Sequence, residues 1–151
     1  MKIETRLLGT IEYEQEDILN FPNGLPSFED EHAFLMLPIE GSGGGLLCLQ
    51  SVTTPALSFL MMNPFSICPS YAPVLQPKER EEMGVSRDQE LCFYVLCALK
   101  RPVEHSTVNM KCPIVLNPDR KLGCQVILDT QEYSMHHPVA DFSKSKEDAS
   151  C

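Results

Sequence analysis

Short apolar segments recur along the chain at intervals of about ten residues, and glycine, proline and asparagine separate them. Several segments alternate apolar and polar residues, as "TIEYE" at 10–14 does, which is typical of strands with one buried face. Regular short strands between turns indicate an all-β fold. We expect strands in the segments 2–9, 10–14, 17–22, 33–39, 45–52, 56–63, 90–99, 105–112, 113–117 and 122–129.

The segment "ELCFYVLCAL" at 90–99 is apolar almost throughout, so both of its faces should be buried. In an antiparallel fold, this pattern favours a central strand of a closed sheet. One short helix is predicted over 76–84, because Pro77 lies near its start and Gly84 at its end. The sequence therefore predicts a compact antiparallel, barrel-like sheet with one short helix.

No long linker or internal repeat divides the chain, and its length suits one hydrophobic core. We expect residues 1–139 to form a single β-domain. The remaining segment 140–151 is polar, and we expect this tail to be disordered. The run "GSGGG" at 41–45 lacks the Gly-Lys-Ser/Thr ending of a phosphate-binding loop, so a flexible turn is expected there.

The formal net charge is −9, and nine acidic residues against two basic ones place −7 of it in residues 1–40. An acidic surface repels phosphate backbones, so we expect no direct nucleic-acid binding. The same surface would speed encounter with a basic protein. The alternative is a solvated acidic face that only keeps the protein soluble.

No apolar run is long enough to span a bilayer, and no apolar stretch of a secretion signal follows Lys2. We therefore expect a cytoplasmic protein that does not contact membranes.

Neither a metal site nor a catalytic constellation is indicated by the spacing of the cysteines and histidines. Structural zinc needs closely spaced ligand pairs, whereas Cys92 and Cys97 are five residues apart. No motif aligns a nucleophile with a base and an orienting group. We expect no catalytic residue, no metal ligand and no cofactor, and hence no enzyme. Five cysteines have apolar neighbours and should pack as small hydrophobes: Cys48, Cys92, Cys97, Cys112 and Cys124.

Two asparagines interrupt a region that otherwise resembles strands, "STVNMKCPIVLN" at 106–117. Pro113 lies between them and has no backbone N–H to donate to a neighbouring strand, which marks a bulge or a sheet edge. The amide of Asn109 could satisfy backbone groups left unpaired there. Asn117 opens the turn "NPDRKLG", where an asparagine side chain can form a hydrogen bond with the backbone two residues later in the chain. A scaffold role is favoured for both.

The segment "NFPNGLPSFEDEHAF" at 20–34 combines a rigid proline- and glycine-containing loop with apolar and acidic residues. Its aromatic residues could fold into the core, or the loop could present a preformed patch to a partner. On the second interpretation, the candidate partner-binding residues are Phe21, Leu25, Phe28, Glu29, Asp30 and Glu31.

Four segments together resemble the flagellar assembly factor FliW family in order and spacing. They are "ILNFPNGLPSFED", "LQSVTTPALSFLMMNPF", "TVNMKCPIVLNPDRKLGCQVIL" and "YSMHHPV". The resemblance departs at Ser27, where the family often has a glycine, and at Cys112, where alanine is usual. The motif residues expected to shape the scaffold are Gly24, Pro26, Gln50, Ser51, Pro64, Asn109, Pro113 and Asn117.

This resemblance implies a non-enzymatic regulator that binds the translational repressor CsrA and also binds flagellin. Accumulated flagellin would displace CsrA, which then represses flagellin translation. The free protein is expected to be a monomer. Neutralising Glu29, Asp30 and Glu31 together should slow CsrA association and leave stability unchanged. The alternatives are a flagellin chaperone without a regulatory role and a small Cys/His hydrolase.

Overall fold

The computed structural model describes residues 1–41, 45–102 and 105–139. The whole of the predicted tail 140–151 and the centre of the predicted 41–45 turn therefore lie outside the described residues. The elements are β1 (Lys2–Thr5), β2 (Gly9–Glu12), β3 (Leu19–Asn20), β4 (Ala33–Pro38), β5 (Leu46–Ser51), β6 (Ser58–Met62), α1 (Pro64–Ile67), α2 (Pro77–Glu82), β7 (Cys92–Ala98), β8 (Thr107–Val108), β9 (Ile114–Asn117), β10 (Leu122–Gln125) and β11 (His137–Pro138), with 3₁₀ turns at Gln15–Asp17 and Asp88–Glu90.

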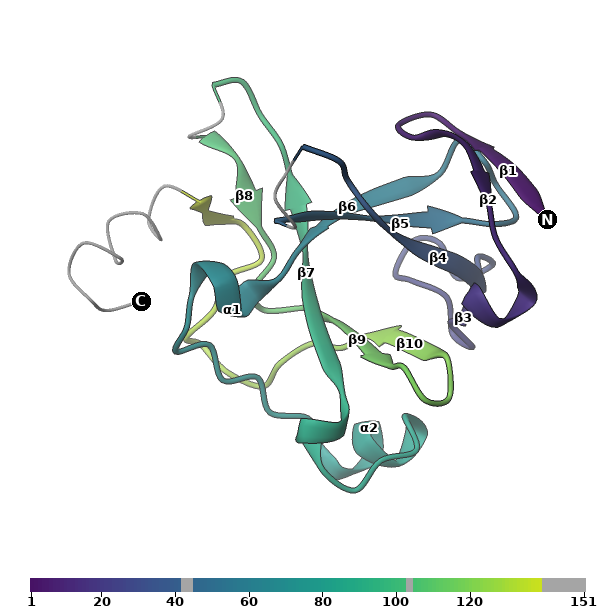
Figure 1. Ribbon diagram of the computed structural model, residues 1–151. Helices are drawn as coiled ribbons and strands as arrows, with labels where there is room; N and C mark the ends of the chain where they lie inside the picture. Colours follow the sequence, from purple (N-terminus) through teal and green to yellow (C-terminus); the bar gives the residue numbers. More distant parts are fainter. Residues whose placement is uncertain (42–44, 103–104, 140–151) are drawn as a thin grey trace.

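Seven strands close into a barrel in the order β7-β6-β5-β4-β3-β10-β9, and β9 returns to pair with β7 (Figure 1). This confirms the predicted all-β, barrel-like fold. Strands β5 and β6 form an antiparallel hairpin, with Leu49 opposite Phe59. The neighbours are antiparallel except β3 and β10, which meet in parallel at Asn20 and Leu122. Strands β8 and β11 extend the sheet outward from β7.

Strand β7 separates two hydrophobic clusters, as its nearly continuous apolar sequence predicted. Tyr94 and Leu96 face the barrel interior, where they pack with a cluster that includes Phe21 and Phe34. Val95, on the opposite face, is buried in a second cluster formed with the segments outside the barrel. Side chains of one strand thus alternate between two cores.

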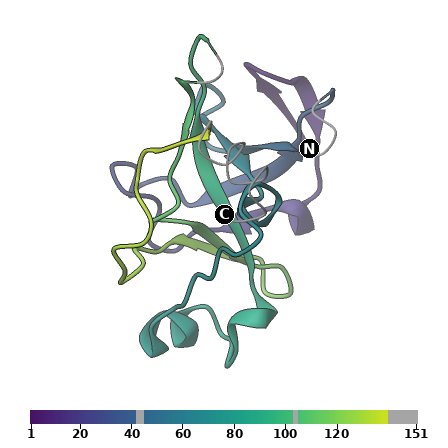
Figure 2. The same cartoon turned by 90° about the vertical axis from the view of Figure 1, so that its left-hand side faces the viewer.

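The N-terminal residues form a separate two-stranded sheet, β1 and β2, in which Ile3 lies opposite Ile11. Ile3 is buried, and Ile11 lines an apolar depression that Leu37 of β4 also borders. Figures 1 and 2 place this hairpin and α2 at opposite ends of the molecule.

The predicted helix is present as α2, but the prediction of a single helix was wrong. A second short helix, α1, begins at Pro64, and the Asn63 side chain caps it by accepting a bond from the Phe65 N–H (2.9 Å). Proline at the first helical position costs no internal hydrogen bond, so "MNPF" is a helix start rather than a strand end. Across the described residues, no helix is long and apolar enough to cross a membrane.

Candidate partner-binding surface

The loop between β3 and β4 turns sharply at Leu25 and Phe28. The Phe28 N–H donates to the Leu25 carbonyl (2.7 Å), and the Leu25 N–H donates to the Phe28 carbonyl (3.3 Å). Pro26 and Ser27 occupy the two central positions, and Ser27 has a φ of +70°. Glycine is favoured at that second central position. Ser27 therefore adopts a backbone conformation that glycine would adopt more readily.

Two of the candidate partner contacts lie inside the protein. Phe21 has no exposed surface and packs edge-on against Phe34, with ring centroids 5.0 Å apart. Leu25 is also buried in the barrel core. Phe28 is 38% exposed and packs edge-on against Phe59. The hypothesis that all three apolar residues form a surface patch is therefore corrected: only Phe28 is exposed.

Glu31 connects this loop to the turn between β5 and β6. Its carboxylate accepts hydrogen bonds from the hydroxyls of Ser51 and Thr54 (2.6 Å for Thr54). These two bonds hold the pKa of Glu31 below its usual value of 4.5. The expectation that Glu31 acts as a free surface charge like its neighbours is therefore wrong, because its carboxylate serves the fold.

We expect Glu31→Gln to destabilise the protein at neutral pH by about 1 kcal/mol, the usual contribution of such hydrogen bonds. Because folding lowers the pKa of Glu31, its contribution is complete above the unfolded pKa and is lost as the pH falls through the folded pKa. The difference between wild type and variant should therefore shrink below pH 4.5. Urea unfolding at several pH values measures this, and a constant difference would contradict it.

Glu29 and Asp30 are exposed, and α2 brings two further carboxylates to a depression that Glu29 borders. A depression of about 360 Å³ lies between the loop and α2, and Glu29, Glu79 and Glu82 border it. We call Glu29, Asp30, Glu79 and Glu82 the acidic surface. Sequence reasoning missed the contribution of α2, because no local pattern signals a contact across 50 residues. No lysine or arginine of the described chain borders the depression.

The two asparagines of the 106–117 region bond to backbone. The Asn109 carbonyl oxygen accepts the Cys112 N–H (2.9 Å) in the turn that precedes Pro113. Asn117 is buried, donates to the Met83 carbonyl (2.7 Å) and accepts the Asp119 N–H (3.1 Å). Asn117 thus joins the turn after β9 to the end of α2. Both side chains hold the scaffold together.

Gln50 and Ser51 organise the turn between β5 and β6. The Gln50 amide donates to the carbonyls of Ser51, Pro55 and Leu57 at 2.9–3.2 Å. The Ser51 hydroxyl oxygen accepts the Thr54 N–H (2.9 Å) while its proton bonds Glu31. The position of the candidate loop therefore depends on this turn.

Burial disfavours the reactive thiolate form of four cysteines. Five carry free thiols: Cys48, Cys92, Cys97, Cys112 and Cys124. Burial raises the pKa of Cys48, Cys97 and Cys112, and it raises the pKa of Cys124 to about 12. A thiol with a raised pKa is a poor nucleophile at neutral pH. Across the described ranges, no three His, Cys, Asp or Glu side chains are grouped so as to hold a metal ion.

Comparison with known proteins places the chain among flagellar assembly factors. The FliW protein family matches residues 2–139. The flagellar assembly factor FliW of Geobacillus sp. (strain WCH70) is 37% identical over 137 residues, which cover 91% of this chain and 94% of the relative. That of Desulfitobacterium hafniense (strain DSM 10664 / DCB-2) is 38% identical over 139 residues, covering 92% and 91%.

A solved structure is also similar to this chain. The crystal structure of the flagellar assembly factor FliW superposes with a TM-score of 0.86 at 36% identity, covering 92% of this chain and 96% of that one. Sequence and fold agree over the same extent of the chain. The chain therefore belongs to the FliW family of flagellar assembly factors.

Proposed function

We propose that this protein is a non-enzymatic, cytoplasmic regulator that binds the translational repressor CsrA and holds it off its messenger RNA. It also binds flagellin, and flagellin that accumulates before secretion displaces CsrA. CsrA then represses flagellin translation until secretion frees the regulator again. Membership of the FliW family supports this proposal.

The observation that carries the CsrA part of the proposal is the acidic surface. Glu29 and Asp30 project from a loop that the Leu25–Phe28 turn and the Glu31 carboxylate hold in place. Glu79 and Glu82 extend the negative charge across the depression. A repressor that binds RNA presents a basic surface, so opposite charges would accelerate encounter. A bound acidic protein would also repel RNA nearby.

The double substitution Glu29→Gln/Asp30→Asn tests the acidic surface and leaves the Glu31 bonds intact. Stability should stay within about 0.5 kcal/mol of wild type, because exposed charges contribute little. The association rate with CsrA should fall severalfold at low salt and become less sensitive to salt. Stopped-flow or biosensor kinetics at two salt concentrations measure both effects.

The matched control is Glu4→Gln/Glu16→Gln, which removes the same charge from two exposed residues of the N-terminal region. This variant should associate with CsrA almost as fast as wild type. Equal slowing by both variants would mean that net charge alone acts. An unchanged rate for Glu29→Gln/Asp30→Asn would place the CsrA interface elsewhere. A protein that binds flagellin but never CsrA would be a chaperone without the regulatory role.

A further inference from the structure

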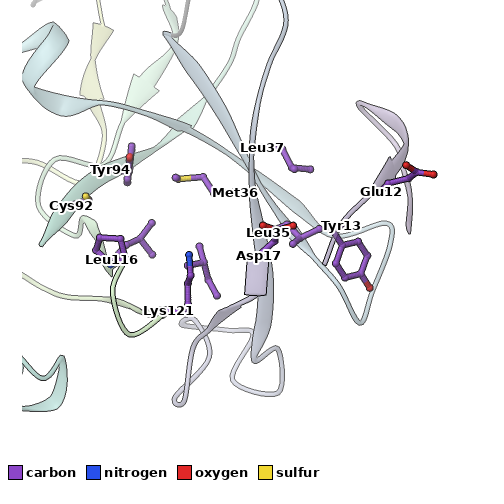
Figure 3. Close-up of a pocket in the computed structure, with 12 residues that line it drawn as sticks. Glu12, Tyr13, Asp17, Leu35, Met36, Leu37, Cys92, Tyr94, Leu116 and Lys121 are labelled. Carbon is purple, nitrogen blue, oxygen red and sulfur yellow. The ribbon is translucent and has the colours of Figure 1, made fainter. Parts of the chain in front are cut away.

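The outer face of β4 and β5 is buried, although it lies outside the barrel core. Leu35 and Leu37 point from β4 away from the barrel interior, whereas Met36 points into it (Figure 3). Leu35 pairs with Gln50 and Leu37 pairs with Cys48, so these four side chains share the outer face. Leu35, Cys48 and Gln50 are at most 1% exposed. Another part of the chain must therefore cover this face.

The N-terminal hairpin of β1 and β2 lies beside this face and is incompletely packed against it. Glu12 and Tyr13 line a cavity of about 400 Å³ together with Leu35 and Leu37 (Figure 3). A second depression, of about 490 Å³, lies between the hairpin and the end of β4, and both Ile11 and Leu37 line it. Atoms that border a hollow lack packing partners on that side, so the contact between hairpin and strand is weak for its extent.

Few interactions hold the hairpin in place. Of residues 1–18, only Ile3 is buried, and it belongs to neither of the two hydrophobic clusters. Within the described chain, the hydrogen bonds and ion pairs of residues 1–13 join them only to one another, as the Met1 amine joins the Tyr13 carbonyl (2.9 Å). A two-stranded hairpin is marginal in water by itself. Its seat on the barrel is therefore apolar and depends on Ile3.

Gln50 adds a polar atom to the covered face. Its side chain is fully buried, and its Oε1 accepts no hydrogen bond from any described residue. A buried acceptor without a partner destabilises the state that buries it, and access of water relieves that cost. The covered state thus carries a penalty that an uncovered state would not.

We infer that the β1–β2 hairpin is a lid that lifts from the outer face of β4 and β5 while the barrel stays folded. The hinge is the segment 13–18, which leads to β3 and contains no buried residue. Elements with few buried contacts open locally at low free energy. Lifting uncovers Leu35 and Cys48 and admits water to Gln50. The occupant of this face is a segment of the same chain, so the inference does not depend on which partners the protein binds.

Cys48 reports on the lid, because its thiol is free and fully buried when the hairpin is seated. Short pulses of iodoacetamide, followed by digestion and mass spectrometry, give the labelling rate of each cysteine. Local opening exposes little surface, so the Cys48 rate should rise with urea much less steeply than global unfolding does. Circular dichroism gives the urea dependence of global unfolding. A Cys48 rate with that same dependence would overturn the inference.

The variant Ile3→Ala should loosen the lid selectively. It should raise the Cys48 labelling rate by on the order of tenfold or more, because it truncates the one buried side chain of the hairpin. Cys112 is the internal control, since this buried free thiol lies in the turn before Pro113 and its rate should not change. Glu4→Gln alters an exposed neighbour on β1 and should leave both rates as they are.

The ratio of the two labelling rates decides the outcome. If Ile3→Ala speeds Cys48 and Cys112 equally, the hairpin unfolds with the barrel and the lid is overturned. If it changes neither rate, the hairpin does not cover Cys48 and the lid is overturned as well. Ile3→Val removes less of the side chain and keeps the test valid where Ile3→Ala is partly unfolded. It should still speed Cys48 severalfold and leave Cys112 unchanged.

Discussion

Replacing Gly24 with alanine is expected to lower the free energy of unfolding by about 3 kcal/mol, as the sum of a backbone cost and a steric cost. Gly24 has a φ of +63°, and residues with a side chain adopt this conformation at a cost of about 1–2 kcal/mol. A Cβ atom there would also lie 2.6 Å from the carbonyl oxygens of Phe28 and Glu29. Backbone atoms cannot rotate aside, so the loop itself must shift.

Gly9→Ala is the matched control, because Gly9 has a φ of +69° but nothing within 4 Å of the added Cβ. It should therefore show the backbone cost alone, about 1 kcal/mol. Urea unfolding followed by circular dichroism measures both variants, since the protein has no tryptophan. Equal losses of stability would mean that the two carbonyls do not constrain Gly24, and that the Leu25–Phe28 turn is looser than the structure indicates.

Local sequence patterns were sufficient for the class of fold. Alternation located most strands, and the apolar run at 90–99 identified β7 as central. The errors occur where side chains bond the backbone locally. The predicted strand 2–9 is split by a turn in which the Thr5 hydroxyl bonds the Gly9 carbonyl (2.8 Å) and accepts the Leu8 N–H (2.8 Å). Such bonds compete with sheet ladders and leave no trace in hydrophobic periodicity.

Contacts between distant segments could not be predicted in this way. The closure of the barrel depends on β7 pairing with β9 and on the single meeting of β3 with β10, and alternation does not identify a partner strand. The same limit applies to the site. Glu29, Asp30 and Glu31 are adjacent in sequence, yet only Glu31 finds hydroxyl partners, on a turn 20 or more residues away. Their different roles follow from the fold rather than from the sequence.

The interpretation of Phe21 as a core residue leads to the second large effect, the substitution Gly123→Ala. A Cβ at Gly123 would lie 2.4 Å from the ring of Phe21 and 2.9 Å from the side chain of Leu116. Phe21 has little room to move, because it is fully buried and packs edge-on against Phe34. We expect a loss of about 2–3 kcal/mol from this overpacking, measured by urea unfolding.

A smaller residue at position 21 should relieve the clash. Phe21→Leu alone should lower the free energy of unfolding by about 1–2 kcal/mol. The double variant Phe21→Leu/Gly123→Ala should lose less stability than the sum of the two single-variant losses. The difference, which is the coupling energy, should be about 1 kcal/mol or more. Phe28→Leu combined with Gly123→Ala is the control, and it should be additive because Phe28 is not among the atoms nearest Gly123.

Partner binding then decides between the two interpretations of Phe21. Substitution of a buried residue weakens partner binding only by lowering the fraction of protein that is folded. CsrA and flagellin should therefore bind Phe21→Leu normally at temperatures where the variant is fully folded. Coupling with Gly123 together with normal binding places Phe21 in the scaffold that supports the loop. Selective loss of one partner by the folded variant, with no coupling to Gly123, would instead mean that Phe21 leaves the core to make that contact.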